Sequence, residues 1–221
     1  MDPLGIPLPA LWNVAGWVLA VAVVARAAQR APWRRFSASE PVHVWYGAIL
    51  FLLMLWSLQG TVGEGFTFHL LGVAALTLIA GPALALVGSA VAVALLLAVH
   101  GGLWANAGVA FVTMAAVPVT VTWLVLRFAE ARLPPNFFVY VFVAAFFGAA
   151  LAYALAGIAG AAVLVLGAGR SAAIVFGEYA PYLVYLAFGE ATLTGMVLTL
   201  AVVYRPQWVV TFDDARYLEG R

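Results

Sequence analysis

The sequence predicts an all-α polytopic membrane protein, with a single transmembrane domain over residues 1–221 and about seven membrane-spanning helices. Hydrophobic residues make up 66% of the chain and charged residues only 9%, whereas a soluble domain carries about 25% charged residues. The mean hydropathy is +1.08. Apolar runs approaching the roughly 20 residues that a membrane span needs recur along the whole chain. The short connections leave no room for a soluble domain, which excludes an ATPase, a kinase or a nucleic-acid-binding fold.

Seven apolar runs are expected to be the spans, at approximately residues 11–28, 42–58, 66–80, 83–99, 104–128, 136–156 and 183–204. The first is expected to be a span and not a cleaved leader, because its arginines follow the apolar residues instead of preceding them. Ser37–Pro41 supplies cap residues and a first-turn proline for the second span. Gly81-Pro82 ends the third span, because proline disfavours helix at the residue before it.

Prolines and length limits define the spans in the second half. Pro118 is expected to kink the fifth span. The stretch 136–169 would be about 50 Å long as one helix, against a hydrocarbon core of about 30 Å, so the sixth span is expected to end near Ala156. Pro181 is expected to separate an interfacial piece, residues 172–180, from the last span.

Arginine placement predicts the orientation. With the N-terminus outside and the C-terminus cytoplasmic, nine of the ten arginines lie on the cytoplasmic side and only Arg170 lies outside. Aromatic residues near span ends are expected to form the interfacial belt: Trp12, Trp45, Trp56, Trp104, Tyr204 and Trp208.

A few polar groups converge on the outer face in this topology. His69 lies at the start of the third span and His100 at the end of the fourth, with Asp2 and the terminal amine of Met1 on the same side. Imidazole, carboxylate and amine groups suit nickel, cobalt, copper or zinc. We therefore predict Met1, Asp2, His69 and His100 as candidate metal ligands; the alternative is that both histidines are only interfacial.

Glu190, inside the last span, is the other candidate functional residue. Burying an ionisable side chain in hydrocarbon costs free energy, so such a residue is expected to have a structural or functional role. It is either a coupling carboxylate or a structural hydrogen-bond partner. The sequence has no cysteine, no His-Glu-x-x-His and no Gly-x-Ser-x-Gly. We therefore expect no catalytic residues and no organic cofactor.

Several short motifs resemble one transporter family. They are His69-Leu70-Leu71-Gly72, Gly81-Pro82-Ala83, Gly101-Gly102-Leu103 with Met114 beyond, the closing Gly189–Thr194 segment, and Arg205-Pro206. Together they are similar to the CbiM/NikM family, the substrate-binding (S) membrane components of energy-coupling factor (ECF) ABC transporters for cobalt and nickel. The resemblance is good over residues 66–118 and 187–206 and weak over the first 65.

The resemblance implies a metal site built on the N-terminus. In the family the ion is bound by the terminal amine, a His directly after the initiator Met, the intervening backbone nitrogen and a later His. His69 matches the later His, but the second residue here is Asp2. Either Asp2 substitutes as an oxygen ligand, or His100 supplies the missing imidazole.

The leading hypothesis is therefore a substrate-capturing, multi-pass protein of the bacterial cytoplasmic (inner) membrane that takes up nickel or cobalt. The resemblance implies a partner transmembrane subunit and ATPase subunits, which would hydrolyse the ATP, so the chain itself is not an enzyme. Membrane lipid is the other expected partner, and nucleic acid is not expected. Two alternatives stay open: a non-transporting scaffold subunit, and a solitary facilitator of copper or zinc.

Overall fold

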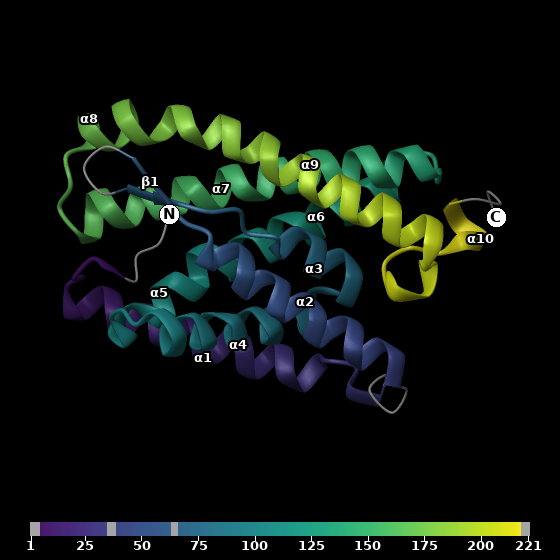
Figure 1. Ribbon diagram of the computed structural model, residues 1–221, viewed down its shortest axis with the longest axis horizontal. Coiled ribbons are helices and arrows are strands. Elements are labelled where there is room, and N and C mark those ends of the chain that lie inside the picture. Colours follow the sequence, from purple (N-terminus) through teal and green to yellow (C-terminus); the bar gives the residue numbers. More distant parts are fainter. Residues whose placement is uncertain (1–4, 35–38, 63–65, 218–221) are drawn as a thin grey trace.

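The computed structural model describes residues 5–34, 39–62 and 66–217, which form a bundle of helices aligned with the long axis of the molecule (Figure 1). Successive long helices run in alternate directions, and the described chain begins and ends at opposite ends of the bundle (Figure 1). The elements are α1 (Ala10–Arg30), α2 (Ser39–Ser57), β1 (Gly60–Val62), β2 (Phe66–Phe68), α3 (Val73–Ala80), α4 (Pro82–His100), α5 (Ala107–Phe111), α6 (Val117–Arg132), α7 (Gly148–Ala162), α8 (Ala172–Ile174), α9 (Ala180–Tyr204) and α10 (Asp214–Tyr217).

Short irregular helices join or extend these elements. The 3₁₀ turns are Trp104–Asn106 and Pro206–Trp208, and the π-helical segments are Val112–Ala116, Val139–Phe147, Val163–Gly167 and Val175–Tyr179. Among the residues that the structure describes, five continuous helices are long and apolar enough to cross a membrane: Ala10–Arg30, Pro82–His100, Trp104–Arg132, Val139–Gly167 and Ala172–Tyr204. The apolar part of α2, Val42–Ser57, is shorter. The protein is an all-α membrane protein with about five candidate spans.

The third predicted span, residues 66–80, is wrong as a continuous helix. Its first residues form β2, which pairs antiparallel with β1 in a register that places Thr61 opposite Thr67. Residues 69–72 are irregular, and α3 has only eight residues. Aromatic and β-branched residues at 66–68 favour a strand. Gly72 adopts a left-handed φ of +67°, which prevents a helix from continuing through it, so α3 begins only after Gly72.

The predicted breaks near Ala156 and Pro181 are also wrong, because both helices continue through them. Val139–Gly167 and Ala172–Tyr204 are longer than the minimal span, which tilt within the bilayer can accommodate. Pro118 and Pro181 each follow a π-helical segment closely. A wide π turn shifts the carbonyl that the proline ring would otherwise meet, so the helix continues past the proline.

Two glycines allow close packing of α1 on α5. Gly16 of α1 lies against Gly108 of α5, and a Cβ on either glycine would collide with backbone atoms of the other helix. Leu8, just before α1, is buried with Val109 and Val163. The start of the described chain is therefore fixed on α5 and on the 3₁₀ turn before it, where Asn106 Nδ2 donates to Ile6 O at 2.6 Å.

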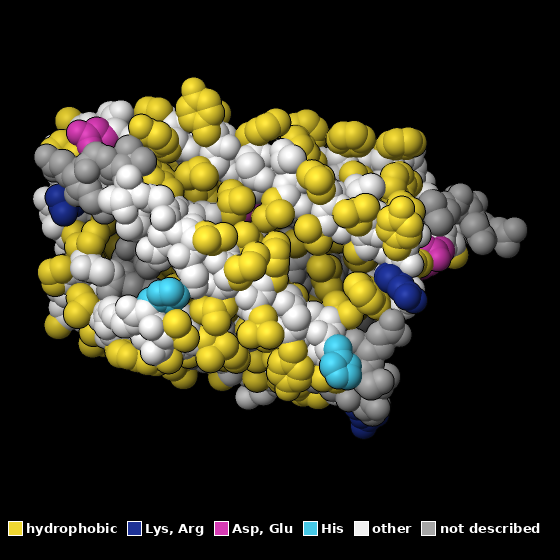
Figure 2. Space-filling view, in the orientation of Figure 1, with side chains coloured by type: hydrophobic (Ala, Val, Ile, Leu, Met, Phe, Trp, Pro, Cys, Tyr) yellow, Lys and Arg dark blue, Asp and Glu magenta, His cyan; other side chains and the backbone are white. Residues whose placement is uncertain are grey.

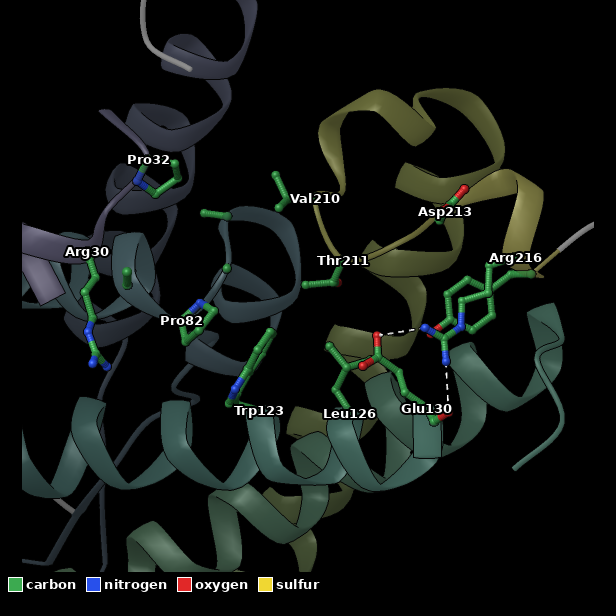
Figure 3. Close-up of a pocket in the computed structure, with 14 residues that line it drawn as sticks. Arg30, Pro32, Pro82, Trp123, Leu126, Glu130, Val210, Thr211, Asp213 and Arg216 are labelled. Atoms are coloured by element: carbon green, nitrogen blue, oxygen red, sulfur yellow. Dashed lines mark hydrogen bonds and ion pairs between the residues drawn. The ribbon is translucent and has the colours of Figure 1, made fainter. Parts of the chain in front are cut away.

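The segment after α9 folds back under α3 instead of extending into solvent (Figure 3). The backbone N–H of Val210 donates to Ile79 O at 2.9 Å, and the Thr211 hydroxyl donates to Leu78 O at 2.7 Å. Arg216 donates to Glu130 O at 2.9 Å, and Tyr217 stacks on Phe212 at 5.1 Å between ring centroids. The tail thus closes one end of the bundle.

Candidate metal site

The His69 loop, residues 69–72 between β2 and α3, holds the most deeply buried imidazole of the described chain. His69 is 2% exposed. Its Nδ1 lies 3.1 Å from Leu70 O. Since a carbonyl only accepts, Nδ1 carries the proton and Nε2 keeps its lone pair. Within the described residues, Nε2 is buried and has no hydrogen-bond partner.

The electrostatics of the loop keep this imidazole neutral. His69 is buried away from water, and burial disfavours the charged form of an imidazole. His69 lies in the irregular stretch between β2 and α3. A neutral imidazole with a free Nε2 is the form that binds a transition metal.

Three side chains from distant helices hold the backbone of the His69 loop, and we call them the loop clamp. Glu190, 1% exposed, accepts the N–H of Leu71 at 2.8 Å and that of Gly72 at 2.7 Å. Trp56 Nε1 donates to Leu71 O at 2.9 Å, and Tyr153 Oη donates to His69 O at 3.0 Å. The loop clamp therefore holds backbone N–H groups and backbone carbonyls of the His69 loop at the same time.

Glu190 also lies beside the N-terminal end of α3, because the two residues whose N–H groups it accepts directly precede Val73. The first N–H groups of a helix have no partner inside it, and they carry partial positive charge. Gly72 itself has no side chain to supply a cap. The Glu190 carboxylate, from α9, therefore lies near the positive end of α3 and satisfies the buried N–H groups of Leu71 and Gly72.

The other predicted ligands have different surroundings. His100 is exposed at the end of α4, and its Nε2 lies 2.8 Å from the Ser57 hydroxyl. Met1 and Asp2 lie outside the described residues. In the part of the chain that the structure describes, no three His, Asp or Glu side chains form a metal cluster. Of the two predicted histidine ligands, His69 is the one whose Nε2 has no hydrogen-bond partner among the described residues and can bind an ion.

Sequence reasoning missed two members of the clamp. Trp56 was expected in the interfacial belt, but it is fully buried, and its ring lies 6.2 Å from that of His69 between centroids. Trp45, which is not part of the clamp but was expected in the same belt, is also buried and donates to Leu84 O at 3.0 Å. Tyr153 could not be predicted as a clamp residue, because its partner His69 lies 84 residues away in the sequence and the two meet only in the tertiary fold.

Comparisons with known proteins agree with this architecture. The family model "CbiM: Cobalt uptake substrate-specific transmembrane region" matches residues 6–208. The fold is similar to that of a solved chain described as "Crystal Structure of an Truncated Transition metal Transporter", with a TM-score of 0.74 and 18% sequence identity over 90% of this chain and 99% of that chain. A comparison with curated proteins gives no match. Since the family model covers nearly the whole chain, the protein belongs to the CbiM family and is a substrate-specific transmembrane component for the uptake of cobalt or a related transition metal.

Proposed function

We propose that this chain captures Co²⁺ or Ni²⁺ on Nε2 of His69, at the outer side of the membrane. The observation that carries the proposal is the buried, unpartnered Nε2 of an imidazole whose tautomer is fixed by Leu70 O. A buried polar atom without a partner is costly, so a ligand for it is expected. An ion bound there would supply the missing interaction.

The rest of the ligand set is also a proposal. The terminal amine of Met1, the following backbone nitrogen and Asp2 are the candidates on the N-terminal side. Asn106, which holds Ile6 O, supports an N-terminal segment that is fixed on the bundle. His100 is the competing candidate, but it would have to leave the Ser57 hydroxyl to reach an ion.

The proposed orientation places the N-terminus outside and the C-terminus in the cytoplasm, with seven passes. The third pass consists of the His69 loop and the short α3. Two features support this orientation: the described chain begins and ends at opposite ends of the bundle (Figure 1), and the arginines gather on one side. The membership of the family further supports an ECF-type transporter of a bacterial inner membrane, with a partner transmembrane subunit and ATPases driving release.

Calorimetric titration of the purified full-length chain with Co²⁺, Ni²⁺, Cu²⁺ and Zn²⁺ tests the site. We expect stoichiometric binding of Co²⁺ or Ni²⁺ that His69→Ala abolishes. His43→Ala is the matched control, because His43 is exposed at the start of α2. His100→Ala shows whether the second imidazole takes part. Folded protein that binds none of the four ions would overturn the proposal and favour the scaffold alternative.

A further inference from the structure

A long apolar groove runs over α3, between α2 and α9. Its volume is about 940 Å³. Ala75, Leu76 and Ile79 of α3 form its floor, and residues of α2 and α9 form its walls, among them Phe51 and Leu200. The groove exists because α3 has eight residues while its neighbours have 19 and 25. Figure 2 shows the hollow between α9 and α2, lined with hydrophobic side chains.

The two ends of the groove differ in charge. At the Gly72 end the lining is apolar. At the other end lie Arg205, which directly follows α9, and His43, together with the aromatic Tyr204 and Trp208. Arg205 is exposed and has no ion pair among the described residues. The lining is therefore amphipathic along its length: a cation and aromatic rings at one end, and hydrocarbon over the rest.

We propose that this groove binds one anionic phospholipid of the arginine-rich leaflet, with an acyl chain along α3 and the phosphate beside Arg205. Tyr and Trp are typical of the headgroup level of a bilayer, and arginine near the surface attracts anionic lipid. A molecule with one charged end and a long apolar body matches this arrangement. This inference does not depend on the metal ligands.

The position of the groove links the lipid to the metal site through α3. Gly72, at the apolar end of the groove, is one of the two residues whose N–H groups Glu190 accepts. A bound acyl chain would therefore pack along the helix that carries the His69 loop at its start. Its headgroup would lie at the end of the bundle where the C-terminal tail closes α3.

Native mass spectrometry of the full-length chain in detergent tests the proposal, with phosphatidylglycerol and phosphatidylcholine of identical acyl chains as probes. We expect one tightly bound lipid and a preference for phosphatidylglycerol. Arg205→Gln should reduce that preference about fivefold, which corresponds to about 1 kcal/mol per arginine near an anionic surface. Arg132→Gln is the matched control, because Arg132 is also exposed but lies outside the groove.

A second pair of variants tests the apolar part of the groove. Gly47 lines the groove and has open space where a Cβ would lie, so Gly47→Leu should place its side chain in the groove with no clash at the Cβ. Gly177→Leu is the control, since Gly177 is also exposed and open but lies elsewhere. Gly47→Leu should weaken both lipids, and Gly177→Leu should weaken neither.

Three results would overturn the proposal: equal binding of the two lipids by the wild type, equal effects of Arg205→Gln and Arg132→Gln, or unchanged lipid binding in Gly47→Leu. Unchanged lipid binding in Gly47→Leu, together with loss of a co-expressed partner transmembrane subunit in that variant, would assign the groove to a helix of the partner.

Discussion

The two ends of α3 are both held by the C-terminal part of the chain, but by different chemistry. At the start of α3, the buried carboxylate of Glu190 accepts two backbone N–H groups. At its end, the backbone of Val210 and the hydroxyl of Thr211 donate to the last carbonyls. The start of α3 carries the His69 loop and lies in the interior, whereas the tail contacts are only partly buried.

This difference indicates which end is adapted to the ion and which to stability. A charged group with two short hydrogen bonds in the interior fixes a geometry strongly, since charge-assisted hydrogen bonds are about twice as strong as neutral ones. Neutral hydrogen bonds at a half-exposed end contribute modestly. Variants at the start of α3 should therefore change both stability and metal binding, and variants at its end should change stability alone.

Glu190→Ala should have the largest effect. It leaves the N–H groups of Leu71 and Gly72 buried without a partner, at about 1–3 kcal/mol each, so we expect roughly 2–6 kcal/mol of destabilisation. Metal affinity should fall about 10–100-fold, as for other residues that orient a ligand. Thermal unfolding in detergent and calorimetry measure the two effects. Thr194→Val, one turn along α9, is the control, because the Thr194 hydroxyl is buried without a partner among the described residues. Similar behaviour of the two variants would contradict the role of Glu190.

The glycines that flank α3 give the second comparison. Gly72 has φ +67° and Gly81 has φ +83°, so alanine is strained at both, by about 1–2 kcal/mol or more. A Cβ on Gly72 would also lie 2.8 Å from Leu55 Cδ1, whereas a Cβ on Gly81 meets nothing within 4 Å. Both variants should unfold at lower temperature, but only Gly72→Ala should weaken metal binding. Equal affinities in the two variants would show that the loop conformation does not control the site.

Thr211→Val tests the tail. It removes the hydroxyl that donates to Leu78 O and lies 2.7 Å from Tyr140 Oη. We expect a loss of about 1 kcal/mol in thermal stability, with metal affinity unchanged. Thr211→Ser should restore most of the loss, and Thr192→Val, at an exposed position of α9, serves as the control. A change in metal affinity on this substitution would remove the distinction between the two ends.

Glu130→Gln should have the smallest effect. Its carboxylate lies 3.8 Å from Arg216 and 3.0 Å from Arg127, whose side chain is 63% exposed. Exposed ion pairs contribute about 0–1 kcal/mol, and Arg216 keeps its hydrogen bond to the Glu130 carbonyl. The change in unfolding temperature should be slight and should shrink further at high salt. A large loss would mean that the tail depends on this ion pair.

The sequence singled out His69 and Glu190, because ionisable residues stand out in apolar runs. Their relation could not be read from it, since Glu190 meets Leu71 and Gly72 across 119 and 118 residues. Hydropathy also failed at residues 66–80, because a strand, a loop and a short helix can all be apolar when buried. The fold of the segment after α9 could not be read from the sequence either, because Val210 and Thr211 bond to α3 carbonyls that are adjacent to them only in the tertiary fold.

The π-helical segments determine where a helix of this protein can lose one residue without a change in its packing. A π turn closes its hydrogen bond one residue later than an α turn, so it takes up an extra residue. Each residue otherwise turns an α-helix by about 100°. In the helix Trp104–Arg132, Val112–Ala116 separates a part that packs on α1 from a part that packs on α7. A one-residue deletion within Val112–Ala116 would preserve the phase of both parts. The same deletion near Thr122 would rotate the rest of the helix and carry Leu126 out of the core.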